Sequence, residues 1–470
     1  MKNKIFMVLC VLALAGCANT EPKKPAEKIS AMEGQKYLAQ YGETISLNEA
    51  LKIARERNLD LRVKSLEREI ASLDKKIAFG NFLPSVNVMG GYTRLDDEIK
   101  LDVDVSELSS RLGNLGIPLP PLPSTMSSRF VDKSFYTFGV NAQIPVFVPS
   151  TWYLYSARQK GEKIGELAEQ FADKMLQLQV MGQYYYILAL ESEQKALEND
   201  LKSAKELEKK VKISVKVEAA LPWELEKAQA YVKMKELALN ENKRDLEIAK
   251  MNFMKTLNLN PLENIALDDE IIFPEQLPSL EDCVYKAISG NEILKITETG
   301  KEISTDVKKI AITNFLPKVI LGGGYVNNTN EILSDPDFLF GNVTGVLSVF
   351  NGFKNVNEYK KAVRKEKIAE LKLEKEFMTI ITETAKAYKN VEKAEEMRQI
   401  SNLNFNAEKG RLHQKKAERS VDMIGDEEYF EALASYENAL SMKKKADFQY
   451  EMALGALKIA MGTNPFEEGK

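Results

Sequence analysis

Several features that would indicate an enzyme or a helical membrane protein are missing from this 470-residue sequence. No internal stretch of about 18 apolar residues exists, which excludes a polytopic helical membrane protein. His413 is the only histidine, which rules out zinc sites with two histidine ligands, and no nucleophile motif lies beside it. It lies in a segment rich in lysine and arginine, which favours a solvated surface position. We therefore expect that the protein is not an enzyme, and that it has no catalytic residue, no cofactor and no metal site.

Cysteine is scarce as well, with Cys10, Cys17 and Cys283 as the only three. The first two lie in or directly after an amino-terminal leader, in which two lysines precede an apolar stretch over residues 5–15, as in a signal peptide. If Cys10 is removed with the leader and Cys17 is modified, Cys283 stands alone. No intramolecular disulfide is then available, so stability must come from packing.

The leader ends in the tetrapeptide Leu14-Ala15-Gly16-Cys17, which resembles the bacterial lipobox. That resemblance implies a lipoprotein signal peptide over residues 1–16, lipidation of Cys17 as a multi-chain membrane anchor, and a lipidated linker over residues 17–45. The absence of aspartate after the cysteine favours the outer membrane by the same analogy. An ordinary secretory signal, in which Cys17 is incidental, is the alternative.

A strong charge of one sign is also missing. The formal net charge is -4, and loss of the two leader lysines moves it to -6, since 63 - 69 = -6. So mild a balance gives no reason to expect nucleic acid as a partner.

What the sequence does contain is an internal duplication. The segment "NFLPSVNVMGGY" at 81–92 returns as "NFLPKVILGGGY" at 314–325, and residues 46–92 align with 279–325 without a gap. The alignment resumes where "IPVFVPS" at 144–150 matches "LSVFNGF" at 347–353. We predict a first structural repeat over 46–262, an equatorial connector over 263–278, a second repeat over 279–465 and a short tail over 466–470. A period above 200 residues indicates a duplicated half rather than a solenoid.

Each repeat contains long helical patterns. An amphipathic helix is predicted from Ser46 to Ala78, with Ser46 and Glu49 forming a capping box. Tracts with almost no internal proline or glycine follow; they predict long helices over 153–217 and 356–416 and returning helices over 223–258 and 427–462. At 1.5 Å per residue, about 65 residues give a rod of roughly 95 Å. No globular core is that long, so we expect coiled-coil pairs.

Each repeat also contains one predicted β-hairpin, within 83–147 and 316–350. Apolar residues alternate with small polar ones over about ten residues, as in a strand that faces lipid on one side and a lumen on the other. A soluble sheet with one face on a core is the alternative. The first repeat contains an acidic, proline-rich insertion between Tyr92 and Phe135 that the second repeat lacks. Such length variation predicts an exposed loop. The predicted lipid face of the first hairpin consists of Val86, Val88, Tyr92, Tyr136, Phe138, Val140 and Ile144.

Four strands cannot close on themselves, and open edges cannot face hydrocarbon, where each unsatisfied amide costs several kcal/mol. Several chains must therefore contribute their strands to one closed barrel. Two chains would reach the eight strands of a small barrel, and three would give twelve and room for a passage.

The duplicated half, the Asn-Phe-Leu-Pro before the strand, the "PVF" before the long helix and the lipobox resemble the TolC-like outer-membrane efflux protein family, in its lipoprotein branch. The resemblance covers residues 46–465. It implies a mixed α and β fold: a long α-helical coiled-coil barrel plus transmembrane β-barrel strands, four per chain, internally duplicated and closed by trimerisation. The glycine pair usual after "PVF" is reduced here to Gly352.

The same resemblance implies a function. A homotrimer would be the outer-membrane channel, or exit duct, of a tripartite efflux pump or a type I secretion system. It would be lipid-anchored and barrel-spanning in the outer-membrane lipid of the cell, with a long periplasmic tunnel. Its partners would be a periplasmic adaptor (membrane fusion protein) and an inner-membrane pump. The alternative from another class is a structural periplasmic coiled-coil lipoprotein, or an adaptor, without a pore.

The family closes its periplasmic end with acidic residues of the second half. The matching region contains Asp422 and Asp426, which we place on one helical face because they are four residues apart, and Glu427. Arg419 and Arg411 are their expected partners. An acidic turn that suits a helix N-terminus is the alternative. The turns at Leu221-Pro222 and Ile424-Gly425 are the expected contacts with the adaptor, although a helix reversal demands a turn there anyway.

Overall fold

The structure is a computed structural model that describes residues 44–107, 111, 125–263, 265–268, 277–330 and 337–466. The expected signal peptide, Cys17, most of the linker and the last four residues of the tail lie outside the described residues. The chain forms two compact units. The helical unit comprises the residues up to Glu67, Glu166–Ile296 and those from Glu374 onward, and the sheet unit comprises Arg68–Gly165 and Thr297–Leu373.

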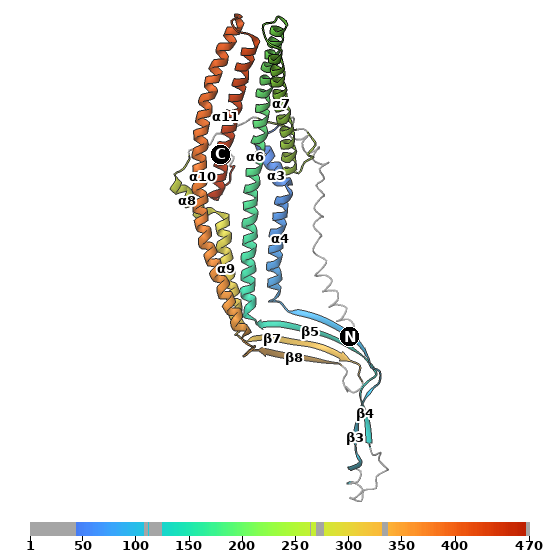
Figure 1. The fold of residues 1–470 in the computed structure, drawn as a ribbon. Coiled ribbons are helices and arrows are strands. Elements are labelled where there is room, and N and C mark those ends of the chain that lie inside the picture. Colours follow the sequence, from blue (N-terminus) through green and yellow to red (C-terminus); the bar gives the residue numbers. More distant parts are fainter. Residues whose placement is uncertain are drawn as a thin grey trace. The chain divides into compact units, whose positions relative to one another are not determined.

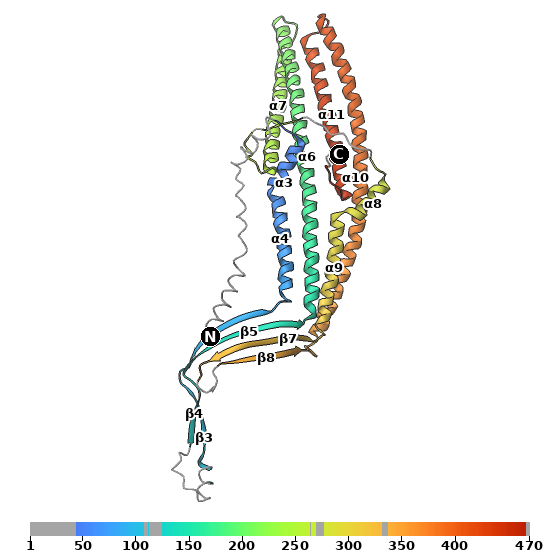
Figure 2. The ribbon, with the colours of Figure 1, turned by 180° about the vertical axis from the view of Figure 1, so that it is seen from behind.

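The duplication is visible in the order of the elements (Figure 1). The helices of the first repeat are α3 (Leu47–Arg57), α4 (Leu59–Gly80), α6 (Pro149–Lys216) and α7 (Pro222–Thr256). Those of the second are α8 (Leu280–Gly290), α9 (Glu292–Thr313), α10 (Lys354–Ser420) and α11 (Asp426–Ala460). In both views α7 lies along α6, and α11 along α10 (Figure 2). None of the described helices combines the length and apolar character needed to cross a membrane.

The predicted capping box is present: Ser46 N donates to Glu49 Oε2 at 2.9 Å, and Glu49 N donates back to Ser46 Oγ at 3.3 Å. The single helix expected after it is wrong, because Asn58 takes an extended conformation and separates α3 from α4. Its side-chain amide donates to Thr256 O at 2.8 Å, at the end of α7. Asn291, its counterpart in the second repeat, donates to Ala460 O at 3.0 Å, at the end of α11.

The long and returning helices end in the same way in both repeats. Glu218, Asn258, Asp422 and Gly462 have positive φ angles of 59, 52, 56 and 74°, and each lies just past a helix end, where a left-handed residue closes the last turn. Gly462 also lies against the backbone of Gly290: a Cβ at Gly462 would lie 2.4 Å from the Gly290 carbonyl carbon. Only glycine fits both constraints.

The core of the helical unit is aromatic and aliphatic. Tyr184, Tyr185 and Phe253 are almost completely buried, and the Tyr185 and Phe448 rings stack at 4.6 Å. The Tyr184 hydroxyl lies 2.9 Å from Ile45 O and 2.7 Å from Asp268 O. The two carbonyls lie at the end of a short parallel pair, β1 (Thr44–Ile45) and β6 (Ala266–Leu267), since Ile45 is the last residue of β1 and Asp268 directly follows β6. A second cluster contains the free, buried Cys283.

One carboxylate in this unit is buried at an energetic cost. Glu451 on α11 is only 9% exposed, and its burial raises its pKa to about 7; Lys458 and Arg398 oppose the rise, and Asp447 adds to it. The folded chain therefore holds this proton more tightly than the unfolded chain does. The stability that the protonated group contributes is fully present below about pH 4.5, the unfolded pKa, and is lost as the pH rises through 7.

We expect Glu451→Gln to abolish this loss. The variant should match the wild type at pH 4 and be more stable by about 2 kcal/mol at pH 8, because its amide carries no charge to bury. Urea titrations at the two pH values, followed by circular dichroism, measure the difference. Glu428→Gln, at an exposed position of the same helix, is the control and should leave the pH dependence unchanged. Equal pH dependence in Glu451→Gln and the wild type would refute the assignment.

The sheet unit contains an antiparallel sheet of β2 (Ser85–Arg94), β5 (Ser134–Phe147), β7 (Lys318–Asn328) and β8 (Asp337–Val346), in the order β2-β5-β7-β8. The segment that reads as an exposed loop carries a further antiparallel pair, β3 (Ile99–Asp104) and β4 (Thr125–Val131). Leu101, Val103 and Met126 of that pair are about half exposed.

Candidate functional site

The register of the four-stranded sheet determines which side chains share a face. Val86 pairs with Ala142, Val88 with Val140, and Tyr92 with Tyr136. Directly paired residues of an antiparallel ladder lie on the same side of the sheet. Since the other members of the predicted lipid face have the same parity along β5, all seven lie on one side.

This apolar face continues across the second repeat. Val140 pairs with Tyr325, which pairs with Leu339, and Ile144 pairs with Leu321, which pairs with Val343. Most of these side chains are exposed in the described chain, with Val88 at 65% and Leu339 at 83%, whereas Val140 and Tyr325 on the inner strands are half-buried. A soluble sheet would cover such a face with its own core, so that alternative does not fit the described residues.

On the opposite face, the only charged residue of these four strands is Lys318, at the first position of β7. The face presents amides, such as Asn87, Gln143 and Asn342, and several glycines, together with apolar side chains such as Ile320 and Phe338. Two larger side chains cover glycines of neighbouring strands: a Cβ at Gly139 would lie 3.2 Å from Met89 Cγ, and one at Gly324 3.1 Å from Phe340 Cε1. Such cross-strand packing protects a ladder that glycine would weaken.

Within the described residues, β2 and β8 each pair on one side only. Their outer N–H and C=O groups form two open edges of about ten residues. An exposed, flat edge of this length is a template for another strand. An apolar face combined with two free edges is what one segment of a larger closed wall requires.

A second candidate site lies in the helical unit, at the turn between α6 and α7. Leu221 precedes α7 and Pro222 is its first residue; Leu221 N donates to Glu224 Oε2 at 2.9 Å. Beside the turn is a groove of about 750 Å³ between the two helices. Trp223, Tyr231 and Met234 line it, and Trp223 is 55% exposed. These three residues were not among the predicted adaptor contacts, although an aromatic residue next to a predicted turn, such as Trp223, can indicate a contact surface.

The corresponding turn between α10 and α11 is charged. Arg419 Nη2 lies 2.7 Å from Asp426 Oδ1, and the guanidinium lies 4.2 Å from the centre of the Tyr429 ring. Glu427 pairs with Lys210 of α6 at 2.7 Å, and this hydrogen bond raises the pKa of Lys210. The last pair joins the helices of the two repeats.

The expected placement of Asp422 and Asp426 on one helical face is wrong. α10 ends at Ser420 and α11 begins at Asp426, so Asp422 lies in the turn, with a φ of 56°. Asp426 and Glu427 belong to the first turn of α11, where carboxylates favour the positive end of the helix dipole. Arg411 contacts Glu431 at 3.3 Å rather than either aspartate. Ile424 and Gly425 lie in the turn itself, and Gly425 is the N-cap of α11.

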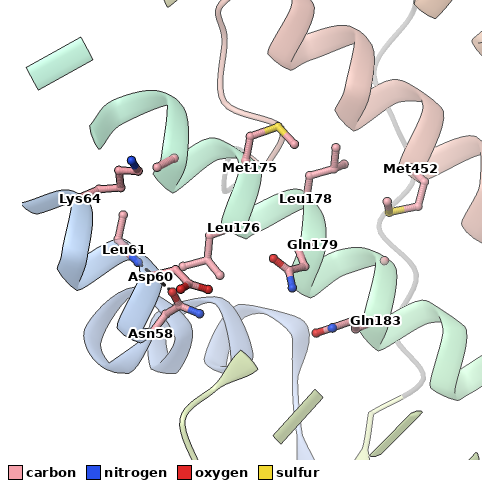
Figure 3. A pocket seen from close by; sticks show the side chains of 12 residues that line it. Asn58, Asp60, Leu61, Lys64, Met175, Leu176, Leu178, Gln179, Gln183 and Met452 are labelled. Atoms are coloured by element: carbon pink, nitrogen blue, oxygen red, sulfur yellow. Dashed lines mark hydrogen bonds between the residues drawn. The ribbon is translucent and has the colours of Figure 1, made fainter. Parts of the chain in front are cut away.

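The helical unit also holds a cavity of about 640 Å³ where α3 gives way to α4 (Figure 3). Gln179 and Gln183 lie on successive turns of α6, and Met452 approaches from α11 (Figure 3). Asp60 and Lys64 are its charged lining residues. No cluster of three or more metal-ligating side chains occurs among the described residues.

The chain shares its fold with solved outer-membrane channels. The CmeC outer membrane channel of Campylobacter jejuni matches it with a TM-score of 0.70 and 16% identity, over 90% of this chain and 87% of the other. The outer membrane protein VceC of Vibrio cholerae matches with a TM-score of 0.67 and 14% identity, over 93% and 99%. The MtrE outer membrane channel of Neisseria gonorrhoeae gives 0.64 and 17%, over 89% of both chains. No family model matches the sequence, and no curated protein matches it significantly.

These matches confirm the predicted fold class at the level of one chain: long paired helices joined to a four-stranded sheet, in the fold of the TolC-like channels.

Proposed function

We propose that this chain, which has the fold of the TolC-like outer-membrane efflux channels, is a subunit of an outer-membrane exit duct. The observation that carries the proposal is the sheet with one exposed apolar face, an opposite face whose only charged residue is Lys318 at its rim, and two open edges. The apolar face would contact lipid and the opposite face would line the passage. The fold shared with the CmeC and MtrE channels supports this reading.

The four strands of one chain require at least one further copy to close a barrel. Three copies supply twelve strands, with β8 of one copy paired to β2 of the next, and leave room for a passage. We propose a homotrimer closed in this way, with the apolar face in the outer membrane, lipid on Cys17 as a further anchor, and the helical unit in the periplasm. A pore-free structural lipoprotein would have no use for an exposed apolar sheet face.

Reconstitution into planar lipid bilayers tests the proposal. The purified chain should migrate as a heat-sensitive oligomer, have the mass of a trimer in detergent and give stepwise conductance. A soluble, monomeric chain that does not conduct would refute it. The test requires no knowledge of the cargo, which the residues of this wall do not identify.

The two turns of the helical unit are the proposed contacts with a periplasmic adaptor, which would link the duct to an inner-membrane pump. The groove beside Leu221 and Pro222 would take an apolar side chain of the adaptor. The turn at Ile424 and Gly425 offers the Arg419–Asp426 pair and Glu427. We propose that the carboxylates at this turn also form the periplasmic gate. Their ion pairs with Arg419 and Lys210 would hold α11 against the neighbouring helices in the closed state, and Asp422 and Arg411 would flank them.

We expect Trp223→Ala to weaken adaptor binding about tenfold or more, because a half-exposed tryptophan beside an apolar groove is a typical binding hot spot. Surface plasmon resonance with the adaptor that co-purifies with the chain measures the affinity. Tyr285→Ala is the matched control, since Tyr285 is an exposed aromatic residue on α8, away from the groove. Equal affinities of the two variants would remove the groove from the proposed contact, and conductance should be retained in both.

A further inference from the structure

The turn that joins β8 to α10 contains a strained phenylalanine. Phe353 has a φ of +62° and follows Gly352 at +67°. Bulky residues rarely take this left-handed conformation, which glycine adopts without cost. Unlike Glu218, Asn258 and Asp422, Phe353 does not close the end of a helix, so helix capping does not explain it.

The surrounding turn holds Phe353 in place. Asn355 N donates to Asn351 Oδ1 at 3.3 Å, and Asn351 Nδ2 donates to Asn355 Oδ1 at 2.8 Å. Asn355 Nδ2 also donates to Asn314 O at 3.0 Å. Strain that a hydrogen-bond network maintains in this way calls for a reason outside the local backbone.

The side chain offers that reason, because its ring contacts the ring of Phe350 edge to face, with centroids 5.3 Å apart. The pair is nonetheless exposed, Phe350 at 72% and Phe353 at 64%, and the adjacent Val349 is 88% exposed. So much aromatic surface left in water would be unfavourable. The Phe350–Phe353 pair therefore needs a partner that the described chain does not supply.

The first repeat contains a similar pair of contacting aromatic rings, formed by residues at different positions. Phe147 is the counterpart of Phe350 in the duplication, and its ring contacts Trp152 edge to face at 5.7 Å. Trp152 lies inside α6, whereas Phe353 precedes α10. The second ring of each pair thus comes from a non-equivalent position. Chance retention after duplication does not account for two separately built pairs at equivalent places.

The position of both pairs identifies the partner. β2 and β7 begin, and β5 and β8 end, at the same rim of the sheet, as the pairings Ser85↔Gln143 and Lys318↔Val346 require. A seam between copies would reach only the edge strand β8, but Phe147 belongs to the inner strand β5. A membrane surface reaches both. The opposite rim carries the contacting rings of Tyr92 and Tyr136, 4.9 Å apart.

From these observations we infer that the Phe350–Phe353 pair is a lipid-interface anchor, which lies at headgroup depth in the periplasmic leaflet as the Phe147–Trp152 pair does. The inference rests on the proposed function. The eleven steps of β5 from Phe147 to Tyr136 span about 36 Å along the strand. At a tilt of about 40° they rise about 28 Å, close to the height of about 25 Å of the apolar band between the aromatic girdles of such barrels. Trp152 suits that depth because its ring is amphipathic, and the phenylalanines beside it add apolar surface for the lipid.

The two native tryptophans provide the controls for the test. Three channels with one tryptophan each are reconstituted in phosphatidylcholine vesicles: Trp223→Phe, which keeps Trp152; Trp152→Phe, which keeps Trp223; and Phe353→Trp with both native tryptophans replaced by phenylalanine. Lipids brominated near the headgroup or near the chain end then quench the fluorescence according to depth. We expect Phe353→Trp and Trp152 to be quenched several-fold more than Trp223, and more by the shallow bromines than by the deep ones.

Quenching at Phe353→Trp no greater than at Trp223, or strongest from the deep bromines, overturns the anchor while Trp152 still reports a membrane-inserted channel. If neither Trp152 nor Phe353→Trp is quenched and the wild type does not conduct, the proposed function fails with it. A second variant checks the strain. Phe353→Gly should conduct and should raise the thermal midpoint in detergent, because glycine accepts the turn freely. A lowered midpoint would show that the ring packs against protein, which also overturns the anchor.

Discussion

Replacing Lys174 with methionine is expected to destabilise the helical unit by about 3–5 kcal/mol, the range for breaking a buried ion pair by removing one partner. Lys174 on α6 is 8% exposed and Glu292 at the start of α9 is 5% exposed, and they form an ion pair. The ammonium also donates to Gly462 O at 2.7 Å, just past the end of α11. Methionine would leave the Glu292 carboxylate and this carbonyl without their donor.

The measurement is urea unfolding in detergent, followed by circular dichroism, and two controls make it specific. Lys233→Met breaks an exposed pair with Glu236 and should cost at most about 1 kcal/mol, because surface pairs contribute little. The double variant Lys174→Met with Glu292→Leu should recover part of the loss, since it leaves no buried charge unpaired. If Lys174→Met costs no more than Lys233→Met, the pair is not the inter-repeat contact that its burial indicates.

This pair also shows what the sequence could not reveal. Lys174 and Glu292 lie 118 residues apart, and their counterparts in the other repeat are uncharged, so neither periodicity nor the duplication marks them. The packing that brings α6 beside the start of α9 creates the contact. By contrast, Asn58 and Asn291 coincide in the alignment of the repeats, but asparagine inside an amphipathic pattern did not break the predicted helix. The break follows from the amides that reach the ends of α7 and α11.

The strands were predictable because alternation and duplication agree. Val86, Val88, Tyr136 and Val140 share a face in the register as their spacing requires. The acidic turn was less predictable. The predicted long helix stops at 416 and the predicted turn lies at Ile424-Gly425, but no glycine or proline between them marks where the helix ends. A helical spacing therefore assigned Asp422 and Asp426 to one face, whereas a left-handed residue separates them.

The second large effect is expected on the apolar face. In the proposed channel, Val88→Lys should abolish insertion and conductance. A lysine on the lipid face costs about 2–4 kcal/mol near the membrane midplane, and three copies incur that cost together. Val88 is 65% exposed and lies in the middle of β2, so no described neighbour shields the charge. The variant should accumulate as a species that does not conduct in planar bilayers and lacks the heat-sensitive oligomer.

The adjacent residue provides the matched control, because successive side chains of a strand point to opposite faces. Asn87→Lys places the same charge one residue away, on the face proposed to line the passage, where water solvates it. This variant should insert, conduct and shift the ion selectivity toward anions, since it adds a positive charge to a wall whose only charged residue in these four strands is Lys318, at the rim. The contrast between the two variants, rather than either result alone, identifies the lipid side of the sheet. Insertion of Val88→Lys with failure of Asn87→Lys would reverse the two faces, and equal behaviour would show that the sheet does not cross a membrane.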